Sequence, residues 1–282
     1  KEFKIINLTG CYDLHVHAAP DVSKRKFTDM RLAEHMVKAG FAGIGLKCHF
    51  AETAARAALL EEQFPQLKVV GGVTLNRSLG GLNPYAVETC GKMGGRFVWM
   101  PTLEARAYKR FHNPKMSEAE AKQFLTVFDE QKKLLPQLHE VLEVAAQYKM
   151  IVCTGHLSAE EGLAVIKAAK EHGVAKCVAT HADNPADFYT KEQQVECVRL
   201  GAVVEHCYFT VFKNRTTPED MVNQLRAVGF DNTFISTDFG QPDNLYPDEG
   251  IGEFLQVLNQ HGVKDEDLEK LAKINPIKLL DA

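Results

Sequence analysis

The stretch CYDLHVH at residues 11–17 decides the fold, because four of the seven later apolar runs repeat its arrangement of a short strand closed by polar side chains. Successive side chains of a strand alternate between its two faces, so we expect His15 and His17 on one face and Leu14 and Val16 on the other. Two neutral imidazoles at one strand end supply half of a metal site.

The eight apolar runs are continuous, which is typical of parallel strands that are buried on both faces. They occupy residues 11–17, 41–49, 67–75, 95–101, 149–156, 174–181, 201–207 and 232–238. Helical patterns fill the intervals, and this alternation predicts βα units in a parallel sheet. The sequence therefore predicts an α/β fold, a (β/α)8 TIM barrel, with a doubly wound open sheet as the alternative.

Helix boundaries between the runs are marked by capping residues. Thr28 is expected to cap a helix over residues 29–39, and Ser158 is expected to open a helix over residues 159–172 with a capping box. A further helix is expected over residues 253–261. Glycines follow all three segments, as is common where helices end.

One interval is too long for a single loop and helix. Residues 102–148 separate the fourth and fifth runs, and we expect a small hairpin from 125–128 and 133–135, followed by a helix that begins at Pro136. We interpret this segment as an insertion between strands 4 and 5 of one domain that spans residues 1–282, a length that suits a barrel.

Composition excludes several classes of protein. The hydrophobic content of 45%, the charged content of 25% and the net charge of −4 are typical of a globular protein and give no reason to expect nucleic-acid binding. No apolar run is long enough to span a bilayer, so we expect no membrane partner. The seven cysteines are scattered, which favours a reducing, cytoplasmic setting. Nothing in the sequence excludes a homo-oligomer.

Polar side chains also close four of the later runs. They are Lys47 and His49, His156, His181, and Asp238. In an α/β barrel the catalytic groups lie at the carboxyl ends of the strands, so these side chains and the two histidines of the first strand are expected to converge. Among the remaining histidines and acids, Glu205 and His206 are weaker candidates, because the parity of the seventh strand cannot be assigned from its sequence.

Lys47 ends a nearly uncharged run, where a buried ammonium without a partner is costly. Its amine could carry a carbamate that bridges two cations, form a Schiff base as a nucleophile, or bind an anionic substrate as an ammonium. A lysine that simply extends to the surface is the alternative without a function. Among clustered histidines and an aspartate, we favour the carbamate.

The substrate is expected to be a small anion. Arg77 lies directly beyond the third strand, where its forked guanidinium could clamp a carboxylate or a phosphate, and we assign His49 to substrate binding as well. Other basic residues of the βα loops would steer anions inward. They are Lys24, Arg25, Lys26, Arg106, Lys109, Arg110, Lys213 and Arg215.

The chain resembles the amidohydrolase superfamily of metal-dependent hydrolases, which are (β/α)8 barrels. The resemblance covers nearly the whole chain and rests on His15, His17, His156, His181, Asp238 and the closing segment INPIKLL at residues 274–280. It implies that His15, His17 and Asp238 hold a buried cation, and that His156 and His181 hold a more exposed one. Zinc suits such ligands best, although manganese, iron, nickel and cobalt are alternatives.

The resemblance also implies a reaction. A metal-activated water would attack an amide, cyclic amide, lactone or ester carbonyl, with Asp238 as the proton acceptor. The alternatives are a lyase or decarboxylase on the same site, a Schiff-base aldolase that uses Lys47, and a barrel that binds metal or ligand without turnover.

The chain departs from the superfamily pattern on the fourth strand. Many members carry a carbamylated lysine or a glutamate there, whereas residues 97–102 read FVWMPT. Lys47 on the second strand is the only plausible bridging group. Either the bridge has moved to Lys47, or the site binds one metal and Lys47 has another role. This departure indicates an uncharacterised branch.

Overall fold

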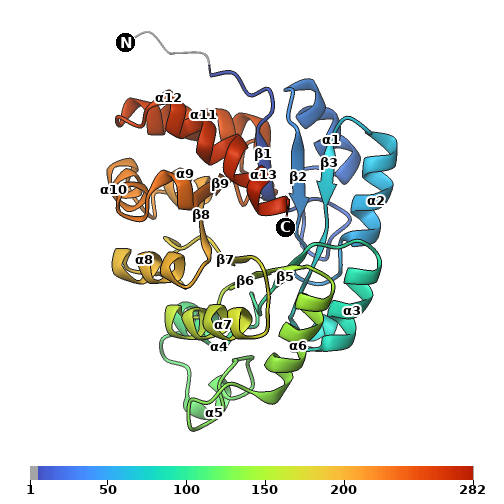
Figure 1. Ribbon diagram of the computed structural model, residues 1–282, viewed down its shortest axis with the longest axis vertical. Coiled ribbons are helices and arrows are strands. Elements are labelled where there is room, and N and C mark those ends of the chain that lie inside the picture. Colours follow the sequence, from blue (N-terminus) through green and yellow to red (C-terminus); the bar gives the residue numbers. More distant parts are fainter. Residues whose placement is uncertain (1–5, 282) are drawn as a thin grey trace.

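A ring of parallel strands carries the fold in the computed structural model, which describes residues 6–281 (Figure 1). The strands are β1 (Tyr12–Val16), β2 (Gly43–Leu46), β3 (Lys68–Val70), β4 (Gly72–Thr74), β5 (Phe97–Trp99), β6 (Ile151–Cys153), β7 (Cys177–Ala179), β8 (Val203–Cys207) and β9 (Thr233–Ser236). Gly71 divides the third strand of the ring, so that β3 pairs with β2 while β4 pairs with β5. From β4 onward, neighbours in sequence are also neighbours in space.

The ring closes where the chain beyond β9 meets β1. Val16 and Phe239 form a parallel bridge, and His17 N donates to Phe239 O at 2.8 Å. The preceding residue takes part as well, since Asp238 N donates to His15 O at 2.9 Å. The predicted barrel is therefore confirmed, and the doubly wound open sheet is not observed.

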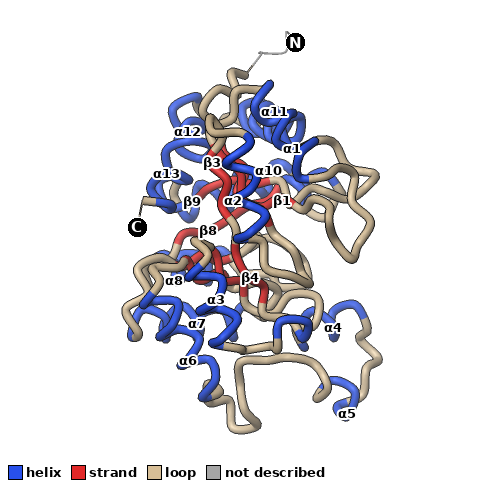
Figure 2. The backbone as a smooth tube through the Cα atoms, turned by 90° about the vertical axis from the view of Figure 1, so that its right-hand side faces the viewer, coloured by secondary structure: helices blue, strands red, loops and turns tan. Residues whose placement is uncertain are grey.

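Helices cover the outside of the ring (Figure 2). They are α1 (Asp29–Lys38), α2 (Ala54–Gln63), α3 (Pro84–Lys92), α4 (Arg106–His112), α5 (Glu118–Ala121), α6 (Pro136–Gln147), α7 (Ala159–Glu171), α8 (Lys191–Arg199), α9 (Tyr208–Phe212), α10 (Pro218–Val228), α11 (Pro247–Gln260), α12 (Asp265–Glu269) and α13 (Asn275–Leu280), with short 3₁₀ turns at Arg77–Leu79 and Phe230–Asn232 and a π-helical turn at Lys270–Ile274. None of the described helices is long and apolar enough to cross a membrane.

The caps that the sequence predicts are present. The Thr28 side chain accepts from Arg31 N, and Ser158 forms a capping box with Glu161. One expectation was wrong: the helix expected over residues 253–261 begins at Pro247, because Pro at the first turn is pre-organised for a helix.

The barrel interior is an apolar cluster that includes Leu14, Phe97, Trp99, Ile151 and Phe234. Leu279 of α13 belongs to the same cluster. Asn275, at the start of α13, donates to two carbonyls. One belongs to Phe230 in the turn before β9, and the other to Thr233, the first residue of β9. Helix α13 therefore covers the amino-terminal end of the barrel, and the polar strand ends lie at the opposite end.

The insertion between β5 and β6 contains α4 and α5 and ends in α6, which begins at Pro136 as expected. The expected hairpin is present in minimal form, as one antiparallel bridge between Phe128 and Leu134 with backbone hydrogen bonds from Asp129 N to Lys133 O and from Leu135 N to Val127 O. The insertion is fastened to the barrel, because Glu161 of α7 accepts from the Thr126 hydroxyl at 2.5 Å. This hydrogen bond joins the insertion to a helix of the barrel, and one domain over residues 1–282 stays a prediction.

Gly240 allows a stability test of the closing seam, the contact between residues 15–17 and the chain directly after β9. Its φ of 140° is rarely adopted by side-chain-bearing residues, and a Cβ there would overlap the carbonyl of His17. We expect Gly240→Ala to cost roughly 3 kcal/mol of unfolding free energy, from backbone strain and overpacking together. Gly173→Ala is the control, because Gly173 also has a positive φ but nothing lies within 4 Å of its Cβ position. Chemical denaturation of the two variants measures the difference, and equal losses would contradict the prediction.

Candidate functional site

Strand β1 places two histidines at the carboxyl end of the barrel. The ring centroids of His15 and His17 lie 5.5 Å apart, and both side chains are buried. The expectation that Leu14 and Val16 share the opposite face was wrong. Leu14 packs inside the barrel, whereas Val16 packs with the helix-side cluster of Phe27. The register against β2 shifts between Asp13 and Val16, and such an irregularity breaks strict alternation.

Asp238 joins the two histidines from the far side of the closing seam. Its Oδ1 lies 3.2 Å from His15 Nε2 and 3.1 Å from His17 Nε2. Burial alone would raise the pKa of Asp238, but the His15 charge and hydrogen bonds from both imidazoles hold it well below its usual range. The donor atoms of the three residues lie within 4.8 Å of one another, which is a spacing that one cation can bridge.

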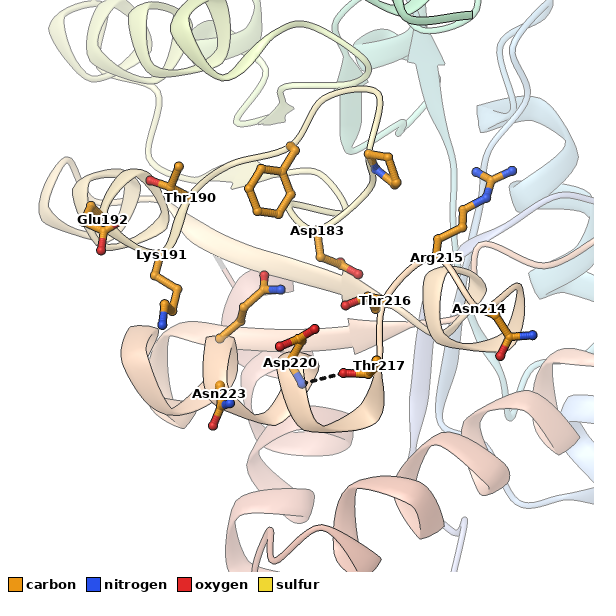
Figure 3. A pocket seen from close by; sticks show the side chains of 13 residues that line it. Asp183, Thr190, Lys191, Glu192, Asn214, Arg215, Thr216, Thr217, Asp220 and Asn223 are labelled. Carbon is orange, nitrogen blue, oxygen red and sulfur yellow. Dashed lines mark hydrogen bonds between the residues drawn. The ribbon is translucent and has the colours of Figure 1, made fainter.

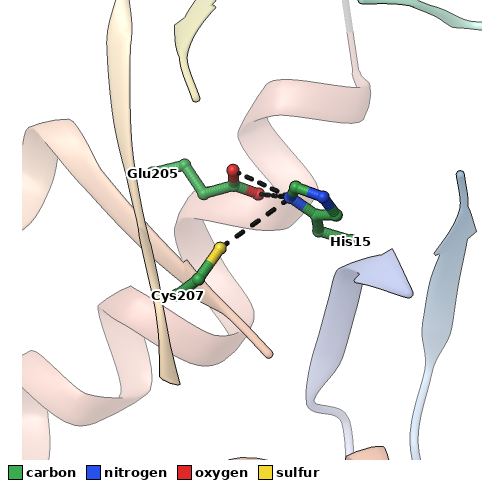
Figure 4. A group of neighbouring side chains, drawn as sticks. All are labelled: His15, Glu205 and Cys207. Atoms are coloured by element: carbon green, nitrogen blue, oxygen red, sulfur yellow. Dashed lines mark hydrogen bonds and ion pairs between the residues drawn. The ribbon is translucent and has the colours of Figure 1, made fainter. Parts of the chain in front are cut away.

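Glu205 of β8 fixes the orientation of His15 (Figure 4). His15 Nδ1 lies 3.0 Å from Glu205 Oε1, and the other carboxylate oxygen accepts from Ser236 Oγ at 3.0 Å. Burial raises the pKa of Glu205, but the His15 charge and hydrogen bond outweigh it and lower the pKa to about 2. An ionised Glu205 therefore accepts the Nδ1 proton of His15 and orients the ring so that Nε2 faces Asp238.

Cys207 also approaches His15, with Sγ 3.8 Å from Nδ1. Together with Glu205 it forms a second group with metal-ligand spacing. Burial raises the pKa of the Cys207 thiol well above its ordinary value, so the thiol stays protonated. Because only thiolate is a strong metal ligand, this group is a poorer metal site than that of His15, His17 and Asp238.

Lys47 lies fully inside the cluster. It is 1% exposed, and its Nζ is 3.0 Å from His15 Nε2 and 5.5 Å from the Trp99 ring. At this distance only one of the two nitrogens can carry the proton between them. Burial and Lys47 lower the pKa of His15, but the carboxylates of Glu205 and Asp238 outweigh them and raise it to about 9.

Three further histidines complete a continuous set of rings. His49 stacks on His17 with centroids 4.8 Å apart, His156 lies 5.7 Å from His49, and His181 lies 5.0 Å from His156. All three side chains are buried. His156 and His181 lie side by side and are 7% and 2% exposed, against 0% and 1% for His15 and His17, so the second, more exposed cation site stays a prediction.

Burial and neighbouring carboxylates shift the pKa values of these imidazoles in different directions. Burial lowers the pKa of His17 to about 3 and holds the pKa values of His49 and His156 well below the ordinary range. His49 Nδ1 lies 2.7 Å from the Thr102 hydroxyl, and His181 Nδ1 lies 2.9 Å from Asp187 Oδ2. Burial lowers the pKa of His181, but the Asp187 charge outweighs it and raises the pKa.

The buried Nδ1 atoms of His156 and His181 both lack a hydrogen-bond partner of good geometry among the described residues, but only His181 has a carboxylate beside it, that of Asp187. A buried imidazole nitrogen without a partner is costly, which is consistent with a ligand that the ring would bind.

Sequence reasoning missed Thr102 and Asp187 and ranked Glu205 too low. Thr102 directly follows the fourth apolar run, residues 95–101, which contains β5. Asp187 lies in the loop after His181. Their position beyond strand ends was the available signal. His206, the other weak candidate, faces away from the site. Its two nitrogens lie 3.0 Å from Asp183 Oδ1 and 3.1 Å from Gln194 Oε1.

Arg77 is engaged by the insertion. Its guanidinium donates to Gln123 O, lies 3.7 Å from Glu104 Oε1 and stands over the Phe124 ring. None of these groups belongs to the histidine cluster. The predicted anion clamp at Arg77 therefore gains no support from its contacts and stays a prediction.

Three comparisons relate this geometry to known proteins. A model of a family of unknown function, DUF6282, matches residues 10–205. No curated protein sequence matches the chain.

Similar solved structures include an amidohydrolase from Pseudomonas aeruginosa, with 13% identity over 96% of this chain and 95% of the other and a TM-score of 0.64. An organophosphorus hydrolase from Deinococcus radiodurans shows 12% identity over 97% and 93%, with a TM-score of 0.60. A 2,6-dihydroxybenzoate decarboxylase from Rhizobium shows 12% identity over 97% and 100%, with a TM-score of 0.58. The expected resemblance to the amidohydrolase superfamily is confirmed at the level of the fold.

Proposed function

We propose that this chain, which belongs to the family of unknown function DUF6282, is a metal-dependent hydrolase of small molecules. One observation carries the proposal: His15, His17 and Asp238 bring their donor atoms within 4.8 Å of one another at the carboxyl end of the barrel. This is the end at which α/β barrels place their active sites.

The residues present fit a divalent cation. His15 Nε2, His17 Nε2 and Asp238 Oδ1 form a mixed imidazole and carboxylate set, which suits zinc, with manganese, iron, nickel or cobalt as alternatives. The Glu205 contact to His15 Nδ1 is the kind of supporting bond that orients a ligating imidazole. His156 and His181 would hold a second cation, with the unpartnered Nδ1 of His156 as a supporting observation.

A bound cation supplies Lewis acidity and lowers the pKa of a water from about 15.7 toward 7. Asp238 would accept the proton of the attacking water and return it to the leaving group, which requires the ionised carboxylate that its lowered pKa provides. The bond broken would be an amide, cyclic amide, lactone or ester. A lyase or decarboxylase reaction is the second candidate, because one similar structure is a decarboxylase.

Lys47 would carry a carbamate that bridges two cations. Its Nζ lies 3.0 Å from His15 Nε2, so a carbamate on this amine would lie among the proposed ligands. We assign the protein to the cytoplasm, because all seven cysteines are buried free thiols. The substrate is proposed to be a small anion, and His49 to contact it.

The metal is tested by elemental analysis of purified protein. We expect at least one equivalent of a transition metal in the wild type, and its loss in a His15→Ala, His17→Ala double variant. His35→Ala is the control, because His35 stacks on Tyr246 and lies outside the cluster. Less than a tenth of an equivalent of every transition metal, unchanged after reconstitution, would end the proposal of a metal site.

Metal affinity should rise with pH. His15 has a pKa raised to about 9, so below that pH a cation must displace the proton that His15 shares with Lys47. We expect the association constant to rise about tenfold per pH unit from pH 7 toward 9, with release of one proton per metal. Calorimetric titration in buffers of different ionisation enthalpy measures that proton. An affinity independent of pH in this window would contradict the prediction.

A further inference from the structure

The βα loops contain five arginines, and four of them have acceptors. Arg25 pairs with Asp21, Arg77 with Glu104 and the Gln123 carbonyl, Arg106 with the carbonyls of Ala121 and Phe124, and Arg110 with Glu118. Arg215 alone has no carboxylate or carbonyl acceptor for its guanidinium within the described part of the chain. Its charge is therefore available to a ligand.

The guanidinium of Arg215 is held by stacking. Its central carbon lies 4.9 Å from the centroid of the Phe209 ring, and its backbone N donates to Thr210 O at 2.8 Å. Stacking uses the face of the guanidinium and leaves its edge, with the paired N–H donors, free to bind an oxyanion in a bidentate way.

Arg215 also lines a cavity of about 730 Å³ (Figure 3). The cavity lies between the loop after β7, which contributes Asp183 and Phe188, and the loop after α9, which contributes Arg215. Asp183 follows the site residue His181 by two positions. In Figure 3 the Arg215 side chain is directed away from Lys191 and Asn223 at the other end of this cavity.

Tyr108 lies beside the histidine cluster. Its ring centroid is 4.8 Å from that of His156, and it contacts His112 at 4.4 Å. Burial raises the pKa of Tyr108, and the Arg215 charge opposes this shift more than any other nearby charge. The loop after β7 links the cavity to the cluster, because Asp187, which lies 2.9 Å from His181 Nδ1, stands between Pro185 and Phe188 of the cavity lining.

We propose that Arg215 binds a carboxylate of the substrate and that the cavity holds the part of the substrate farthest from the bond that is broken. The inference rests on the proposed function of the histidine cluster. A monoanion suits the cavity better than a dianionic phosphate, because its lining contains the carboxylates of Asp183, Glu192 and Asp220 beside only two cations, Lys191 and Arg215.

Two esters with the same leaving group test this specificity in metal-loaded protein. 4-Nitrophenyl glutarate carries a distal carboxylate, and 4-nitrophenyl acetate does not. We expect Arg215→Gln to raise the KM for the glutarate ester at least tenfold more than the KM for the acetate ester, since hydrogen bonds to charged groups are strong. For Arg215→Lys we expect a KM for the glutarate ester between those of the wild type and Arg215→Gln, because lysine keeps the charge but lacks the paired N–H donors of the guanidinium. Arg199→Gln is the control, since Arg199 is exposed and pairs with Glu196 on α8.

Glutarate binding, measured by calorimetry, provides a second readout that does not depend on turnover. We expect Arg215→Gln to weaken it about tenfold, and Arg199→Gln to leave it unchanged. If neither ester is cleaved but glutarate binding still depends on Arg215, the hydrolase proposal fails and the Arg215 inference stands. Equal KM changes for the two esters, or dependence of glutarate binding on Arg77 in place of Arg215, would overturn the inference.

Discussion

Asp238→Asn is expected to lower kcat by two to four orders of magnitude while the metal is retained. The amide oxygen can still approach His15 Nε2 and His17 Nε2, at the positions that Asp238 Oδ1 occupies at 3.2 and 3.1 Å. An amide cannot accept the proton of the attacking water, and general base catalysis of this kind contributes about 10²–10⁴-fold. Steady-state kinetics on a cleaved ester or lactone, with elemental analysis of the same sample, measures both quantities.

Asp243→Asn is the matched control for Asp238. It removes a carboxylate from the same loop, but Asp243 is exposed. A turnover of Asp238→Asn near that of the wild type would refute the role of Asp238 as base. Loss of metal together with turnover would instead identify Asp238 mainly as a ligand.

Lys47→Ala is expected to lose both metal and activity, and short carboxylic acids such as formate, acetate or propionate are expected to restore part of both. The reason is geometric. Lys47 is 1% exposed and its Nζ lies 3.0 Å from His15 Nε2, so a carbamate on this amine would place its oxygens within the histidine cluster. A free carboxylate could occupy the space that truncation leaves.

Lys47→Met separates the amine from its packing, because it fills much of the same buried space without a nitrogen. It should fold, lose metal and resist rescue, since no space is vacated for an added acid. Labelling with ¹³C-bicarbonate adds a spectroscopic test, in which the wild type shows a carbamate carbon that Lys47→Ala lacks. Full metal retention by both variants would end the carbamate proposal and favour a single cation, with Lys47 in another role.

The catalytic end of the barrel could be predicted from sequence because its residues follow a local rule. His15, His17, Lys47, His156 and Asp238 each close an apolar run, and parallel strands bring all such ends to one edge. The caps of α1 and α7 were also predictable, because a cap involves residues only three positions apart. Such features depend on neighbours along the chain.

Contacts between distant strands could not be predicted in this way. Glu205 supports His15 only because β8 pairs with β9 and the chain beyond β9 meets β1, which brings together two residues that are 190 positions apart in sequence. The direction in which Glu205 faces depends on the parity of a strand whose two polar residues, Glu205 and His206, are adjacent, so no periodicity reveals it. The register shift in β1 likewise depends on its pairing with β2.

The sequence by itself determined the barrel, the helices around it and the set of polar strand ends, since hydrophobic patterning and capping act over short distances. Tertiary structure alone decided which basic residues have acceptors. Arg77 appeared the better anion ligand in the sequence, yet the insertion engages it through Glu104 and Gln123. Within residues 6–281 the guanidinium of Arg215 stacks on Phe209 and has no carboxylate or carbonyl acceptor. Charge can be read from a sequence, but pairing requires the positions of groups that lie far apart along the chain.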